Sequence, residues 1–209
     1  MAKRKPKIQN IADQHQHIFE IGKDAVMDQK FLNLPEEVQQ ELNQIYDQMS
    51  RNAAKNIPRL LELKQQYPRV PTIFNYLSAA YSTVDIAKQE QCIEENYQTN
   101  PKNLFARCHY AQLCLRRNEV DKVPDIFDNK HDIKTLYPRR NRFHPAEYAA
   151  FVAMMCRYFI ASKQRAKAEI AYKSLQDTVP LAIETIQLKP LMYPSFFKRL
   201  GNKILSGLE

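Results

Sequence analysis

Cysteine and histidine are the side chains in this sequence that could act as nucleophile, general base or metal ligand. The four cysteines, Cys92, Cys108, Cys114 and Cys156, are separated by 16, 6 and 42 residues. A structural zinc site or a redox motif needs a close pair of cysteines, and the sequence has none. We therefore interpret the cysteines as small apolar residues of helices, kept as free thiols.

The histidines indicate no site either. His15 and His17 stand two residues apart, so they would diverge on a helix and could share a metal only on a strand. Cys108 and His109 are adjacent in the sequence. Adjacent helical side chains point too far apart to form the hydrogen bond between a nucleophile and its base. The sequence thus predicts a protein that is not an enzyme, with no catalytic residue, no metal and no cofactor.

The distribution of glycine limits the fold. Gly22, Gly201 and Gly207 are the only glycines among the 209 residues. Tight β-hairpins use glycine at positive φ, and phosphate-binding loops need it for a close approach of the backbone. A central body without glycine argues against both features and favours helices.

Three prolines each end a run of apolar residues at helical spacing. Pro68 and Pro101 are 33 residues apart, and Pro180 ends the last run. A period of this length is typical of stacked helical hairpins, because a single hairpin cannot bury its apolar face alone.

The last of these runs, FVAMMCRYFIASKQRAKAEIAYKSLQDTVP, resembles the tetratricopeptide repeat (TPR). Its large, small, aromatic and closing proline positions correspond to Val152, Met155, Cys156, Phe159, Ala168, Tyr172, Leu175 and Pro180, with Leu175 in place of the usual alanine. Weaker copies begin at Leu42 and Tyr46, at Phe74, and at Tyr110. The resemblance covers roughly residues 35–180.

The resemblance implies an all-α fold, a right-handed α-α superhelix of about four TPR-like hairpins with a C-terminal capping helix. We divide the chain into a basic N-terminal tail and lead-in segment (1–34), the array (35–180) with an insertion at 130–144, and the capping region (181–209). Apolar spacing and cap signals predict helices near 35–51, 56–67, 71–83, 86–99, 103–117, 119–129, 145–161, 164–178 and 193–206.

In TPR proteins the first helix of each unit builds a concave inner surface. Carried over position by position, this implies a peptide-binding groove formed by Thr72, Asn75, Tyr76, Phe105, His109, Gln112, Arg116, Met154 and Arg157, with Glu37, Gln40, Glu41 and Gln44 in the first unit. These residue types do not match the lysine, asparagine and arginine clamp of chaperone-binding members. An ordinary solvated surface is the alternative interpretation of this face.

Basic residues gather in two places outside the repeat. Lys3, Arg4, Lys5 and Lys7 supply half of the formal net charge of +8. The insertion at 131–144 combines cations with aromatic residues, at Lys134, Tyr137, Arg139, Arg140 and Arg142. Such a mixture can hold phosphates and stack on bases, or its aromatic residues can fix the loop to the array while its arginines face water.

We expect a non-catalytic protein-protein interaction module or scaffold that binds a peptide or helix of a partner protein in the groove. The alternative is a nucleic-acid-associated helical repeat protein that uses the basic tail and the 131–144 loop. No apolar segment approaches the length of a membrane span, and no signal segment precedes the body. The sequence therefore predicts a cytoplasmic protein.

Overall fold

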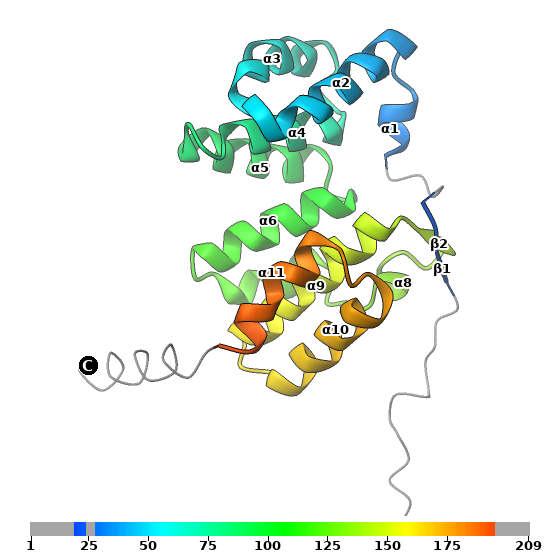
Figure 1. The fold of residues 1–209 in the computed structure, drawn as a ribbon, viewed down its shortest axis with the longest axis vertical. Helices are drawn as coiled ribbons and strands as arrows, with labels where there is room; N and C mark the ends of the chain where they lie inside the picture. The colour runs from blue at the N-terminus through cyan, green and yellow to red at the C-terminus, as the bar shows by residue number, and fades with distance from the viewer. Residues whose placement is uncertain (1–18, 24–27, 195–209) are drawn as a thin grey trace, which may run out of the picture.

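A computed structural model of the chain describes residues 19–23 and 28–194, and most of them are helical (Figure 1), which confirms the all-α class. The helices are α1 (Gln29–Leu32), α2 (Glu36–Asn52), α3 (Ile57–Gln66), α4 (Pro71–Tyr81), α5 (Ile86–Thr99), α6 (Leu104–Arg116), α7 (Val123–Ile126), α8 (Ile133–Leu136), α9 (Pro145–Ala161), α10 (Arg165–Thr178) and α11 (Ile183–Met192), with 3₁₀ turns at Ala53–Asn56 and Val120–Lys122. Two short strands, β1 (Glu20–Ile21) and β2 (Arg142–Phe143), complete the described part.

Local sequence signals explain where the long helices begin. The side chains of Asp85 and Asn103 accept hydrogen bonds from backbone amides in the first turns of α5 and α6, those of Lys88 and Ala106. Proline occupies the first turn of α3, α4 and α9, where its missing N–H costs nothing. The predicted boundaries of these helices agree with the structure to within about two residues.

Two helix ends adopt the left-handed conformation without glycine. Asn118 after α6 has φ of 59° and Lys163 after α9 has φ of 60°. The following amides, of Glu119 and Gln164, bond back to the carbonyls of Cys114 and Phe159, both at 2.8 Å. These bonds form the usual C-terminal cap, so the array makes its tight turns with residues other than glycine.

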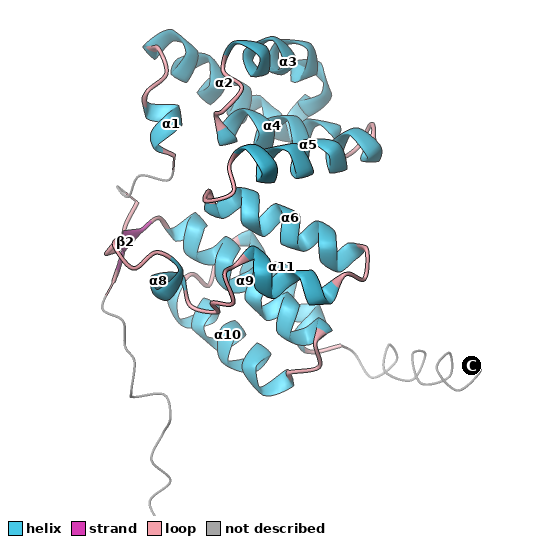
Figure 2. Ribbon diagram, turned by 180° about the vertical axis from the view of Figure 1, so that it is seen from behind, coloured by secondary structure: helices cyan, strands magenta, loops and turns pink. Residues whose placement is uncertain are grey.

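The core consists of two apolar clusters. One extends from Leu34 to Cys92 and joins α2, α3, α4 and α5; the other extends from Leu104 to Met192 and joins α6 to α11. Helix α6 contacts both α5 and α9. Figure 2 shows it between the pair α4 and α5 on one side and α9, α10 and α11 on the other.

Two predicted helices differ from the structure. The helix predicted at 119–129 is a 3₁₀ turn followed by the four-residue α7, because Asp128 and Asn129 have φ of 53° and 57° and end it. The capping helix predicted at 193–206 lies almost entirely outside the described residues, and Tyr193 and Pro194 are not helical. Helix α11, which the sequence analysis missed, packs on α9 and α10.

The lead-in segment joins the insertion through backbone pairing. Strand β1 pairs in parallel with β2, with Glu20 opposite Arg142 and Ile21 opposite Phe143. The ring of Phe19 meets the ring of Phe143 edge to face, with 5.5 Å between their centroids. Residues 19–23 are thus part of the folded body.

Within the described residues, no helix combines the length and the apolar character needed to cross a bilayer.

We predict that Ala168→Glu destabilises the fold by about 3 kcal/mol or more. Ala168 lies on α10, which packs on α9, and it is fully buried, so the new carboxylate would lack a partner. Ala166→Glu is the matched control, since Ala166 is exposed on the same helix. Urea unfolding of both variants measures the difference. Equal midpoints would contradict the packing described here.

Candidate functional site

One open cavity of about 760 Å³ lies on the side of the array where α2, α4 and α6 face the lead-in segment. Its lining comes from α1, α2, α4, α6 and the start of α9, with Asp28, Phe31, Leu32, Asn43, Tyr46, Thr72, Asn75, Tyr76, Asn103, Phe105, His109, His144 and Ala146. Five of the nine predicted groove residues, Thr72, Asn75, Tyr76, Phe105 and His109, therefore meet in one place.

Aromatic rings form much of the cavity. Tyr46 on α2 stacks on Tyr76 on α4, with centroids 5.8 Å apart and planes inclined at 30°. Burial, with the nearby charges of Tyr46 and Asp47, raises the pKa of Tyr76 to about 12. Tyr76 therefore presents a neutral phenol at any ordinary pH, and Phe105 faces the same space from α6.

A chain of hydrogen bonds runs from Lys30 on α1 through the buried side-chain amides of Asn100 and Asn96 to Asn75 at the cavity. Lys30 Nζ donates to Asn100 Oδ1 at 2.6 Å, Asn100 Nδ2 donates to Asn96 Oδ1 at 3.0 Å, and Asn96 Nδ2 donates to Asn75 Oδ1 at 3.0 Å. The ammonium of Lys30 can only donate. Asn100 must therefore accept from Lys30 through Oδ1 and donate onward through Nδ2, and Asn96 follows the same order. As a result, Asn75 accepts through Oδ1.

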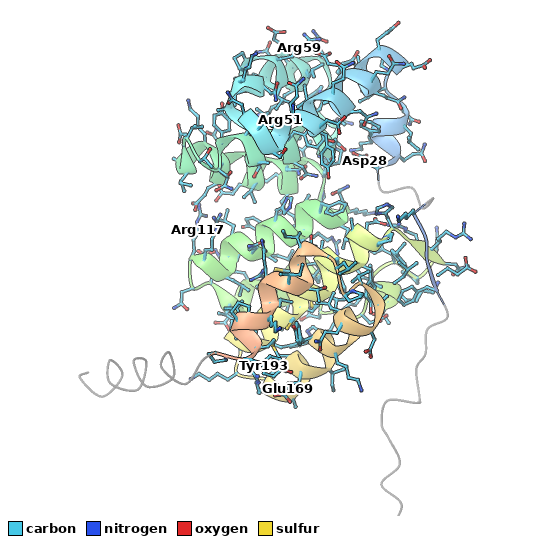
Figure 3. All side chains as sticks on the ribbon, viewed as in Figure 1. Asp28, Arg51, Arg59, Arg117, Glu169 and Tyr193 are labelled. Carbon is cyan, nitrogen blue, oxygen red and sulfur yellow. The ribbon has the colours of Figure 1, made fainter. Side chains whose placement is uncertain are left out.

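Asp28 attaches the lead-in segment to α4. Its Oδ1 accepts from the backbone amides of Lys30 and Phe31 and caps α1, while its Oδ2 accepts from the amide and the hydroxyl of Thr72, at 3.3 and 2.7 Å. Figure 3 shows Asp28 at the beginning of α1. Four donors thus satisfy this carboxylate, and α1 becomes a wall of the cavity.

His109 is an uncharged member of the lining. Burial lowers the pKa of His109 from 6.5 to about 4, so its imidazole is neutral at pH 7. Its neighbour Cys108 points into the core instead, and burial raises the pKa of that thiol. The two side chains therefore occupy separate environments, as expected for adjacent helical residues.

The other four predicted groove residues lie elsewhere. Gln112 and Arg116 are exposed further along α6, and Arg116 lies 3.8 Å from a carboxylate oxygen of Glu90. Met154 is only 3% exposed and belongs to the same apolar cluster as Leu188 and Met192 of α11. Burial lowers the pKa of Arg157, which senses the charge of Glu184 at the start of α11.

The prediction for the last unit was thus wrong for Met154, because α11 packs where an open surface was expected. In the first unit, the predicted face Glu37, Gln40, Glu41 and Gln44 contributes nothing to the cavity, whose lining from α2 is Asn43 and Tyr46. Tyr46 was interpreted as a packing residue of the repeat, but it is 63% exposed.

The cations of the insertion are largely engaged within the protein. Arg140 forms a two-pronged ion pair with Glu147, at 2.8 and 2.7 Å, and its guanidinium lies 4.5 Å from the ring centroid of Phe143. Arg142 bonds to Glu20 at 2.6 Å. Lys134 donates to the carbonyls of Pro138 and Arg140 and to the Asn141 side chain.

The remaining loop residues divide between packing and solvent. Tyr137 donates its hydroxyl to the carbonyl of Lys102 at 2.8 Å, and burial raises its pKa. Arg139 is exposed. These contacts agree with the interpretation that the aromatic residues fix the loop to the array, whereas Arg140 does not simply face water as that interpretation expected.

A second cavity of about 410 Å³ lies between the insertion and helices α9 and α10. Phe19, His131, Asp132 and Lys167 are among its lining residues. The ammonium of Lys167 already lies over the ring of Phe159, 5.6 Å from its centroid. This cavity has none of the residues predicted for binding.

All four cysteines are free and buried. In residues 19–23 and 28–194, no three histidine, cysteine, aspartate or glutamate side chains gather closely enough to hold a metal. Comparison with family models, with curated proteins and with solved structures yields no match to this chain.

Sequence reasoning missed the contributions of α1 and of the start of α9. Asp28, Phe31 and Leu32 were assigned to a tail, although Asp28 followed by a short apolar pair is a signal for a capped turn. His144 was counted only as part of the insertion. Its Nδ1 accepts from the amide of Ala146 at 3.1 Å and caps α9 at the edge of the cavity.

We predict that the protein loses stability as the pH falls from 6.5 towards 4 and that His109→Gln removes part of this loss. The unfolded chain protonates His109 near pH 6.5 and the folded chain only near pH 4, so unfolding takes up a proton between these values. The effect is at most about 3 kcal/mol, reduced by solvent at the open cavity. Urea unfolding of His109→Gln and of the natural chain across this pH range measures it, and an unchanged slope in His109→Gln would contradict the assignment.

We predict that Arg140→Gln destabilises the protein by about 3 kcal/mol, because it leaves the Glu147 carboxylate, whose side chain is 1% exposed, without its cation. Arg139→Gln, at the exposed neighbouring position, should change stability by less than about 0.5 kcal/mol. Thermal and urea unfolding compare the two. A small effect of Arg140→Gln would contradict a structural role for the Arg140–Glu147 ion pair.

Proposed function

We propose that this chain is a TPR-like helical repeat protein without catalytic activity that binds a segment of a partner protein in the cavity between α1, α2, α4, α6 and α9. The observation that supports this proposal most strongly is the convergence of the predicted groove residues of α4 and α6 on one open cavity. Its volume of about 760 Å³ is in the range of ligand-binding sites.

The lining suits recognition better than chemistry. It offers aromatic surface and neutral amides, and its single carboxylate, that of Asp28, is occupied by the caps described above. Of its two histidines, His144 caps α9 through Nδ1, and His109 is held neutral by burial and has no hydrogen-bond partner in the described part of the chain that would orient it as a base. A cytoplasmic location stays a prediction from the sequence.

Nucleic-acid binding has less support. Lys134, Arg140 and Arg142 already bond to carbonyls and carboxylates of the same chain, so the loop offers fewer cations to phosphates than its composition suggested. Titration of generic RNA and DNA against a chain without residues 1–18 tests this alternative. Tight binding with a steep salt dependence would support it.

We predict that Tyr76→Ala and, separately, Phe105→Ala abolish the capture of native partner proteins, because each removes an aromatic wall of the cavity. Gln112→Ala is the matched control, exposed on α6 but outside the lining. Quantitative pull-downs from the native host compare the three, after circular dichroism has shown that each is folded. Partners retained equally by all three would refute the proposed binding site.

A further inference from the structure

The orientation of Asn75 leaves a hydrogen-bond donor at the cavity. Its Oδ1 accepts from Asn96, and this polarity is fixed from the other end of the line, where Lys30 can only donate. The Nδ2 group of Asn75 makes no hydrogen bond within the described residues, and Asn75 lines the cavity. The site therefore offers a fixed neutral donor, which suits a carbonyl oxygen of a ligand.

Negatively charged groups are poorly matched to this lining. None of the described residues that surround the cavity is a lysine or an arginine. A carboxylate entering it would lose its hydration without gaining a cation, and such a loss is costly. It would also approach the carboxylate of Asp28.

Positively charged groups are poorly matched for a different reason. The oxygens of Asp28 are taken by the amides of Lys30 and Phe31 and by Thr72, so this carboxylate is not free to pair with a ligand. The same loss of hydration that lowers the pKa of His109 would disfavour a ligand ammonium buried beside it. Cation-π attraction to Tyr46 and Tyr76 is worth only about 0.5–2 kcal/mol and does not offset the loss of hydration.

Aromatic surface is what remains. Tyr76, Phe105 and Phe31 approach from three different helices, and Tyr46 extends the surface outward, being 63% exposed. Rings of this kind gain most from a flat or long apolar side chain that displaces water from them. A neutral donor beside an aromatic pocket matches a peptide whose anchoring side chain is followed by its own backbone carbonyl.

We propose that the cavity selects a peptide segment by one uncharged aromatic or long aliphatic side chain, inserted among Tyr76, Phe105 and Phe31, with an adjoining backbone carbonyl bonded to Asn75 Nδ2. This inference rests on the proposed function and specifies the chemistry of the partner. The occupant is a segment of another protein, with phenylalanine, tyrosine, leucine or methionine as its anchor.

A random 12-residue peptide display library, selected on the immobilised intact chain, tests the proposal. The selected peptides should share one aromatic or long aliphatic position and should fail to bind the Tyr76→Ala chain. In a synthetic selected peptide, replacing that position by alanine should weaken binding at least about tenfold, and replacing it by lysine or glutamate at least about thirtyfold.

The variant Asn43→Lys provides a reciprocal test, because Asn43 is exposed at the edge of the cavity and a lysine there would supply the missing cation. It should reduce the penalty for the glutamate-anchored peptide about fivefold to tenfold relative to the natural chain. An unchanged penalty would show that absence of a cation is not what rejects carboxylates.

The outcomes separate the two proposals. Selected peptides that depend on Tyr76 but carry a charged anchor would overturn this inference and leave the proposed function standing. A library that yields no peptide, or only peptides that ignore Tyr76, would overturn both. A dimer of the free chain in sedimentation that Tyr76→Ala dissociates would identify a second copy as the occupant and overturn the inference.

Discussion

The burial of α6 on both sides is the constraint on which the rest of the structure depends. Helix α6 contacts α5 of the N-terminal cluster and α9 of the C-terminal cluster, and seven of its residues are buried. A helix with apolar residues on more than one face must be covered on more than one side. The N-terminal and C-terminal helices therefore pack against opposite sides of α6. The stacking brings Phe105 and His109 of α6 level with Asn75 and Tyr76 of α4.

The cavity is a product of this stacking combined with the lead-in segment. Helices α4 and α6 contribute lining residues, and α1 adds a wall that is held by the hydrogen bonds that Thr72 donates to Asp28. The line of amides from Lys30 to Asn75 then determines which atom of Asn75 is available to a ligand. The helix packing thus provides the space, while a buried polar network provides the chemical selectivity.

Most of the long helices could be predicted from the sequence, because they have strong apolar periodicity and ordinary caps. The early end of the helix predicted at 119–129 could not be predicted. Asp128 and Asn129 have positive φ, and apolar periodicity does not reveal where non-glycine residues adopt this conformation. Helix α1 has only four residues, which is too short for a period to be recognised. Within the site, the predicted residues of α4 and α6 line one cavity, whereas Met154 is buried, because the packing of α11 on α9 depends on contacts far along the chain.

The pairing of β1 with β2 has a consequence for synthesis of the protein. Glu20 and Arg142, which bond across the two strands, are 122 residues apart in the chain. The helices between them make mostly neighbouring contacts and can assemble as they leave the ribosome, whereas long-range pairings form late. A nascent chain will therefore carry its first aromatic wall, Tyr46 on Tyr76, well before translation reaches His144 and Ala146 at the far edge of the cavity. During that interval the ring of Tyr46, which is 63% exposed in the finished fold, is accessible to other proteins before the cavity is complete.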